Sequence, residues 1–215
     1  MFNGLACETL SAVCYNPNVV LASHIIFTAY GFWLPNDPRG SWSDFVRNWE
    51  IYWFGGPTKP NEQRPPPLDE QDDILRLVQK TALRYPPAEF DGVQARAVAR
   101  GVARAVEESK YEVYAFTSMQ SHAHAVVGRH DNPAERIISH LKARGTQQLI
   151  AEGIHPLAKY QKPDGEIPRC WARRGWKVFL DSVDDIERAI SYVEDNPVKE
   201  GKRRQNWTFV KPYEG

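Results

Sequence analysis

Hydrophobic and polar positions follow two different periods along the chain, and the shorter period predicts strands. Four short runs are rich in β-branched and aromatic side chains, which is typical of strands, and they cover residues 19–30, 111–119, 122–128 and 176–180. The first run is mostly β-branched and aromatic, as in a buried strand. The second and third flank a turn at Gln120-Ser121, so they are expected to pair antiparallel.

Apolar side chains recur at helical spacing in four other segments, near residues 68–84, 91–110, 133–152 and 183–196. Asp91 is placed to cap the second of these helices. Ser182 and Asp185 form a capping box at the start of the last one. That helix is expected to end near Asn196, because a residue before proline disfavours the helical conformation and Pro197 follows.

Glycines, prolines and tryptophans interrupt both periods in residues 31–67, which predicts a long insertion without regular structure. Its tryptophans favour an ordered segment. Trp33 and Trp42 could stack on unpaired bases, although packing within the insertion explains them better. We therefore expect an N-terminal extension over 1–18, a single domain over 19–201 and a C-terminal tail over 202–215. A few strands among several helices predict an α/β sandwich of modest size.

The charge balance argues against a protein that coats long nucleic acids. The 215 residues include 27 basic and 27 acidic side chains, a net charge of zero, whereas non-specific binding grows with the number of phosphates neutralised. A local basic groove remains open, and ordinary solubility explains each basic residue equally well. Two basic segments are the candidates for DNA binding, and they contain Arg169, Arg173, Arg174 and Lys177, and Lys199, Lys202, Arg203 and Arg204.

The sequence also disfavours membrane proteins, secreted proteins and proteins with CxxC pairs. No apolar run approaches the roughly 20 residues that a membrane span needs, and the first residues lack the pattern of a signal peptide. Three cysteines, Cys7, Cys14 and Cys170, form no CxxC pair, so free thiols in a reducing cytoplasm are the simplest interpretation. We expect a cytoplasmic protein without a membrane partner.

The first candidate chemistry is a pair of histidines on a predicted strand. Side chains alternate along a strand, so His122 and His124 project from the same face and could ligate one divalent cation. An isolated His-x-His pair is a weak signal. One core histidine beside one exposed histidine accounts for it equally well.

The predicted helix after Ser182 adds a second feature. Ile186, Ile190 and Val193 form its apolar stripe, and Tyr192 lies about 110° from the centre of that stripe at 100° per residue. Asn196 follows one turn later on the same face as Tyr192. A phenol and an amide therefore stand side by side, although Asn196 alone would be explained as the last helical residue before proline.

These residues resemble a known family. Residues 121–124 (SHAH) resemble the HUH motif, and residues 192–197 (YVEDNP) resemble the catalytic helix of the single-tyrosine HUH transposases. Residues 27–40 look like a signature of the branch with the REP-associated tyrosine transposases and related insertion-sequence enzymes. Residues 170–176 resemble the turn before that family's last strand. The four segments occur in the family's order between residues 24 and 201.

The resemblance implies an α+β, ferredoxin-like fold, with helices packed on a central antiparallel sheet. It also implies cleavage of single-stranded DNA, often beside a hairpin. By position, His122, His124 and Asn196 would hold Mg²⁺ or Mn²⁺, and Tyr192 would attack the phosphate to give a 5′-phosphotyrosine and a free 3′-hydroxyl. Tyr192 would serve the metal site of its own chain or that of a partner in a homodimer.

Some features depart from the family pattern. Ala123 is smaller than the usual residue between the histidines, and Ser121 stands where Asn or Asp is common. The neutral charge and the insertion fit a divergent or domesticated member. Two rival hypotheses stay open: a hairpin-DNA-binding protein without nicking activity, and an unrelated metal hydrolase built on His122 and His124.

Overall fold

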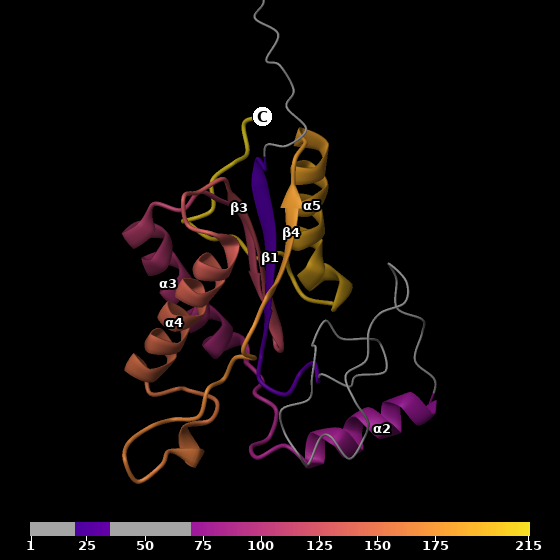
Figure 1. Ribbon diagram of the computed structural model, residues 1–215, viewed down its shortest axis with the longest axis vertical. Coiled ribbons are helices and arrows are strands. Elements are labelled where there is room, and N and C mark those ends of the chain that lie inside the picture. Colours follow the sequence, from indigo (N-terminus) through magenta and orange to yellow (C-terminus); the bar gives the residue numbers. More distant parts are fainter. Residues whose placement is uncertain (1–19, 35–69) are drawn as a thin grey trace, which may run out of the picture.

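The computed structural model describes residues 20–34 and 70–215, and it consists of one antiparallel sheet between two layers of helices (Figure 1). The predicted N-terminal extension and most of the predicted insertion, including Trp42, lie outside the described residues, as do Cys7 and Cys14. Cys170 is buried and free. None of the described helices has the length and hydropathy needed to cross a bilayer.

Four strands form the sheet in the order β2-β3-β1-β4. They span Ala22–Thr28 (β1), Val113–Ser118 (β2), His122–Gly128 (β3) and Trp176–Leu180 (β4), and each pair of neighbours is antiparallel. Two described helices lie between β1 and β2 in the sequence, and the second of them packs on the sheet. Another helix follows β3, which gives the β-α-β-β-α-β connectivity of ferredoxin-like folds with one extra helix among the described residues. The predicted α+β fold class with a central antiparallel sheet is confirmed.

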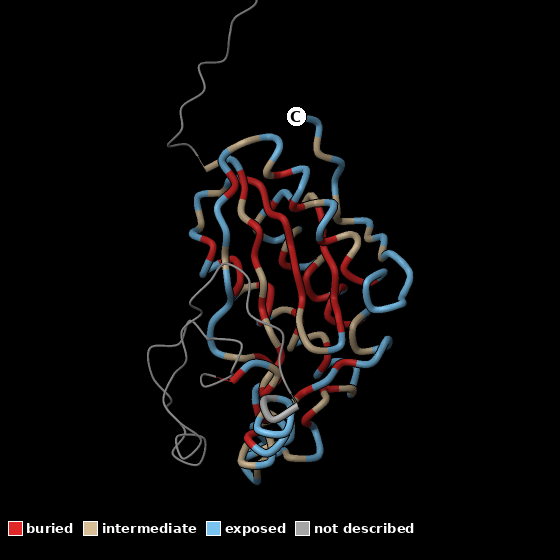
Figure 2. Tube along the Cα trace, turned by 90° about the vertical axis from the view of Figure 1, so that its right-hand side faces the viewer, coloured by how far each residue is buried: buried red, intermediate tan, exposed pale blue. Residues whose placement is uncertain are grey.

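Two helices cover one face of the sheet. Asp91 accepts hydrogen bonds from Val93 N and Gln94 N and caps α3 (Gly92–Ser109), while α4 (Ala134–Ala151) crosses α3 closely. A Cβ added at Gly101 would lie 2.3 Å from the carbonyl oxygen of Arg144, so the crossing requires glycine there. The main core lies between this helix pair and the sheet, and Figure 2 shows the strands as the most continuously buried part of the chain.

The opposite face is covered by α5 (Val183–Lys199). Its buried residues Ile186, Ala189 and Val193 form a second, smaller core with apolar side chains of the sheet. Ser182 caps the helix by accepting a hydrogen bond from Asp185 N, as predicted, while the Asp185 carboxylate accepts from the Ser182 hydroxyl where a full capping box would have it accept from the Ser182 backbone amide.

The predicted end of this helix is wrong, because α5 continues through Pro197 to Lys199. Proline lacks one backbone donor, but Pro197 is buried and its carbonyl oxygen accepts hydrogen bonds from the amides of Glu200 and Lys202. Burial and these two bonds hold the last turn in place. Tyr192 and Asn196 therefore both stand within regular helix.

The remaining segments lie outside the sheet and the three helices that cover it. Helix α2 (Glu70–Thr81) is shorter than the predicted segment and lies apart from the sheet in Figure 1, and a short 3₁₀ helix, η1, spans Ala158–Tyr160. The predicted C-terminal tail packs against β2. The amide of Lys211 donates to the carbonyl of Val113, and Trp207 and Phe209 pack near Phe116.

Candidate active site

The register of the sheet determines which side chains face α5. Thr28 pairs with His122 and Ile26 with His124, so His122 and His124 project from the same face as His24, two residues before Ile26 on β1. Ala123 points to the other face, into the core beneath α3 and α4, opposite Phe27. We call His24, His122 and His124 the histidine cluster.

The rings of this cluster touch one another. The centroids of His122 and His124 lie 4.8 Å apart with the planes at 81°, and those of His24 and His124 lie 5.3 Å apart in a stacked arrangement. His24 Nε2 lies 3.0 Å from His124 Nδ1, and Ser121 Oγ lies 3.2 Å from His122 Nδ1. Within the described part of the chain, hydrogen bonds thus engage the Nδ1 atoms of His122 and His124 and leave their Nε2 atoms available.

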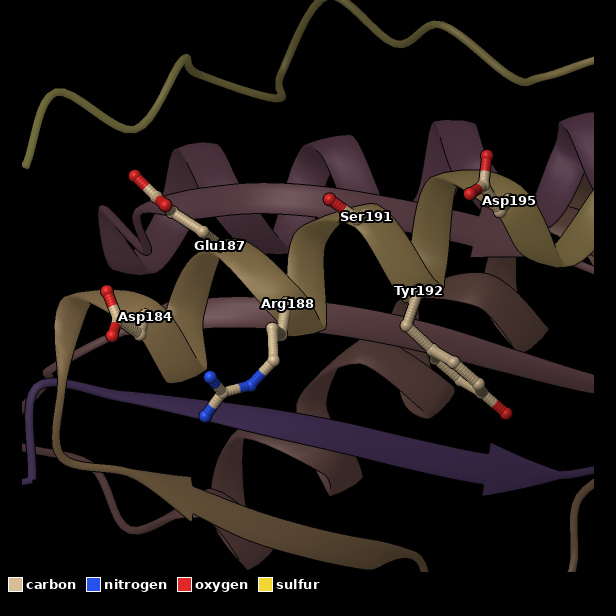
Figure 3. Close-up of a pocket in the computed structure, with 6 residues that line it drawn as sticks. All are labelled: Asp184, Glu187, Arg188, Ser191, Tyr192 and Asp195. Atoms are coloured by element: carbon tan, nitrogen blue, oxygen red, sulfur yellow. The ribbon is translucent and has the colours of Figure 1, made fainter.

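Tyr192 lies over the cluster from α5. Its ring centroid is 5.7 Å from that of His124 and 5.8 Å from that of His24, in both cases edge to face. The side chain is 46% exposed, so its hydroxyl can be approached from solvent. In Figure 3 its hydroxyl end points away from the helix. A phenol accessible to a large substrate therefore stands against two imidazoles from neighbouring strands.

Asn196 follows one turn later on α5 and is buried. Its Nδ2 atom has no hydrogen-bond partner among the described residues, and so it donates to neither histidine. The two ends of an amide are distinguished only by their partners, so a rotated amide would present the carbonyl oxygen at the same place. A buried amide one turn after Tyr192 that has no partner for one of its ends could offer its oxygen to a divalent cation.

Burial sets the charge of the cluster. Desolvation lowers the pKa of His24 to about 4. Desolvation, followed by the charges of His122, His24 and Lys199, lowers the pKa of His124 to about 2. The pKa of His122 is lowered mainly by desolvation, with Glu200 raising it and Lys202 lowering it. The three rings are neutral near pH 7, which is the state in which an imidazole binds a metal ion.

The fit of a metal to these residues is partial. No group of three or more His, Cys, Asp or Glu side chains in residues 20–34 and 70–215 is arranged to hold a metal ion. A cation on His122 and His124 would therefore need Asn196, water or a substrate oxygen to complete its coordination. Catalytic sites keep such open positions for substrate, whereas structural sites are closed.

Two further side chains border the cluster and the tyrosine. Lys199 Nζ lies 4.3 Å from the centroid of the Tyr192 ring, on the last turn of α5. Phe32, just beyond β1, stacks on His122 with centroids 5.6 Å apart and planes at 19°. The site thus has a cation beside its phenol and an aromatic face beside one histidine.

Of the eight basic residues predicted to bind DNA, Lys199 contacts the site. Lys177 is paired with Glu135, Lys202 with Glu200, and Arg204 with Glu194 and Asp195. The remaining four are exposed on the loop before β4 and on the segment after α5, and they are Arg169, Arg173, Arg174 and Arg203. Internal carboxylates already neutralise part of the predicted basic surface.

A shallow groove runs along the outer side of α5 from Asp184 to Asp195 and includes Tyr192 (Figure 3). Its charged side chains are Asp184, Glu187 and Asp195 against one cation, Arg188. Phosphate would be repelled by this surface. An anionic ligand would reach Tyr192 more favourably from the Lys199 end of the helix than along the groove.

The sequence prediction missed His24. A polar side chain within the apolar run of residues 19–30 was a visible signal, but its meaning depends on which strand lies beside β1. It also missed the position of Phe32 over His122.

Comparisons with known proteins leave the family unassigned. The sequence matches no protein-family model and no curated protein. A solved structure of a REP-associated tyrosine transposase bound to a REP hairpin is similar, with a TM-score of 0.44 and 11% sequence identity, over 85% of this chain and 69% of the other.

Proposed function

We propose that the protein cleaves single-stranded DNA and transfers the strand through a 5′-phosphotyrosine intermediate on Tyr192. The observation that carries the proposal is the half-exposed phenol of Tyr192 against His24 and His124. A tyrosine with a purely structural role on α5 would be expected to join the buried stripe of Ile186, Ala189 and Val193. A nucleophile instead needs one side in solvent and the other beside groups that stabilise charge.

His122, His124 and Asn196 would hold a divalent cation, Mg²⁺ or Mn²⁺. Such a cation stabilises the negative charge that builds on the non-bridging phosphate oxygens during attack. The two available Nε2 atoms and the unpartnered amide of Asn196 support this assignment. The partial coordination is consistent with a site completed by the DNA phosphate.

The reaction balances without an energy source. The Tyr192 oxygen forms a bond to phosphorus as the bond from phosphorus to the 3′-oxygen breaks. The phenol releases its proton to solvent, and the departing 3′-oxygen takes up a proton from solvent to become a hydroxyl. The phosphodiester is replaced by a phosphotyrosine ester, so a 3′-hydroxyl can reverse the attack and join strands. Lys199, beside the Tyr192 ring, is positioned to stabilise negative charge on the phenol oxygen or on the phosphate.

The test uses hairpin oligonucleotides with single-stranded flanks, labelled at one end only. The protein is incubated with each set and Mn²⁺, and covalent adducts are resolved on a denaturing gel. The proposal predicts that the 3′-end label moves onto the protein, whereas the 5′-end label leaves on a shorter strand with a 3′-hydroxyl. Tyr192→Phe should abolish the adduct, and EDTA should do the same.

Tyr213→Phe is the matched control, because Tyr213 lies on the C-terminal segment against Tyr114, and it should form the adduct normally. Binding of the oligonucleotides without an adduct would replace the proposal with a hairpin-binding protein. Hydrolysis that survives Tyr192→Phe but not His122→Ala would replace it with a metal hydrolase.

A further inference from the structure

His24 contributes the third ring of the cluster but has no part in the reaction described above. It is 9% exposed and lies on β1, the strand between β3 and β4. Its side chain reaches diagonally across the sheet, from the position opposite Val126 to the ring of His124, two residues earlier on β3. His24 also touches the ring of Tyr192, so it contacts both a candidate ligand and the candidate nucleophile.

The contact between His24 Nε2 and His124 Nδ1, at 3.0 Å, needs one proton between the two nitrogen atoms. A neutral imidazole carries one N–H, so the position of that proton decides which nitrogen of His124 is free. If His124 Nδ1 donates, its Nε2 keeps a lone pair. If His24 donates instead, His124 Nε2 carries the proton and cannot bind a cation.

We propose that His24 is a positioning residue that accepts the Nδ1–H hydrogen bond of His124 and so holds His124 Nε2 ready for a divalent cation. The inference rests on the proposed function for the role of His124 as a ligand. Metal-binding histidines generally donate their second ring N–H to a neighbour, which fixes the tautomer and the ring orientation. His24 is the neighbour that the structure provides for His124 Nδ1.

Ser121 provides a comparison within the same site. Its hydroxyl, 3.2 Å from His122 Nδ1, can both donate and accept, so it orients the ring but leaves the tautomer of His122 undetermined. A neutral imidazole has one donor and one acceptor nitrogen, so His24 Nε2 either donates or accepts according to the tautomer of His24, and it accepts from His124 Nδ1 in the Nδ1–H form. The two histidines of the motif are therefore supported by neighbours of different chemistry.

Three variants test the role of His24. His24→Leu removes the acceptor, and His24→Gln keeps a side-chain carbonyl that can accept from His124. His155→Leu is the matched control, because His155 is also a buried histidine and its hydrogen bond to Leu157 N lies outside the site. Thermal unfolding first verifies that each variant is folded.

The first measurement is the tautomer of His124, read from long-range ¹H–¹⁵N correlations of the histidine rings without metal. The second is the affinity for Mn²⁺ without DNA, measured by electron paramagnetic resonance. Wild-type protein should show His124 with its proton on Nδ1. His24→Leu should shift that proton towards Nε2 and weaken Mn²⁺ binding by about 10- to 100-fold, the usual effect of losing such a neighbour. His24→Gln should retain most of the affinity, and His155→Leu should change neither readout.

Two results would overturn the proposal. One is an unchanged His124 tautomer and unchanged Mn²⁺ affinity in His24→Leu. The other is a His24→Gln variant that binds as weakly as His24→Leu while His124 keeps its tautomer, which would make His24 a direct ligand. Both readouts omit DNA, so a wild-type protein that behaves as expected here but forms no adduct would contradict only the proposed function.

Discussion

A neutral histidine has one nitrogen with a lone pair that can bind a metal ion, and the hydrogen-bond partner of the other nitrogen determines which nitrogen that is. In this protein Ser121 and His24 engage the Nδ1 atoms of His122 and His124. Tyr192 contacts the cluster with one edge of its ring and is 46% exposed to solvent. At the scale of residues, the candidate site is a set of hydrogen-bonded rings and not a set of carboxylates.

His155, a buried histidine outside the site, provides an independent prediction. His155 Nδ1 accepts a hydrogen bond from Leu157 N, and burial lowers the pKa of His155 from its ordinary 6.5. Just below pH 6.5, His155 is therefore protonated in the unfolded chain more readily than in the folded protein. The contribution of the neutral His155 to the free energy of unfolding is complete above pH 6.5. It is lost as the pH falls from 6.5 towards the lowered pKa of the folded protein.

His155→Asn should remove this pH dependence, since an Asn side chain can accept the same bond and does not titrate. We expect the free energy of unfolding of the variant, relative to that of the wild type, to rise as the pH falls below 6.5, by at most about 1.4 kcal/mol per pH unit. Urea unfolding of both proteins at several values between pH 5 and 8 measures this. A constant difference would contradict the prediction.

At the scale of elements, the two faces of the sheet have different neighbours, with the main core on one and the candidate site on the other. Ala123 leaves room for Phe27 in the main core while its neighbours His122 and His124 face α5. The buried ammonium of Lys142, on α4, donates to the carbonyls of Ala172 and Arg174 and holds the turn that leads into β4. The helix pair beneath the sheet is thereby tied to the strand beside β1.

The crossing of α3 and α4 is sensitive to one methyl group. Gly101→Ala would place a Cβ 2.3 Å from the carbonyl oxygen of Arg144, and backbone has to move to relieve the clash. We expect a loss of about 1–3 kcal/mol in the free energy of unfolding, as in overpacked cores.

Gly92→Ala is the control for this prediction. The nearest atom to its added Cβ is the flexible end of Arg96, 3.7 Å away, so the change should be neutral or slightly stabilising. Urea unfolding compares the two variants, and equal stability would contradict a tight helix crossing.

At the scale of the whole molecule, the candidate site lies between the sheet and α5. β1 and β3 present the cluster, and α5 lays Tyr192 and Asn196 over the same face. The charges are distributed unevenly around it, with carboxylates along the outer groove of α5 and Lys199 at its end. This asymmetry favours approach of a phosphate backbone from one side, even though the chain as a whole is neutral.

A ligand that binds only the folded protein raises its stability, which makes metal binding measurable without DNA. Mn²⁺ at about 100 times its dissociation constant should add about 2.7 kcal/mol, or about 5–10 °C in Tm for a protein of this size. The double variant His122→Ala/His124→Ala should lose this shift. An equal shift in both proteins would contradict a cation site on these two residues.

Much of the fold follows from local periodicity. The period of two along residues 122–128 already puts His122 and His124 on one face, and the helical period places Tyr192 off the apolar stripe of α5, because each pattern is contained in a few consecutive residues. The start of α5 just after its N-cap, Ser182, was predictable for the same reason. Its end was not, since the burial of Pro197 depends on packing.

The long-range neighbours depended on the tertiary structure. Nothing in residues 19–30 says that β1 lies between β3 and β4, and without that order His24 is only a polar residue in an apolar strand. The contacts of His24 with His124 and of Tyr192 with both rings join segments separated by tens of residues, up to 168 along the chain. Strand order and register depend on how the whole sheet buries its two faces. No pattern within a few consecutive residues contains that information.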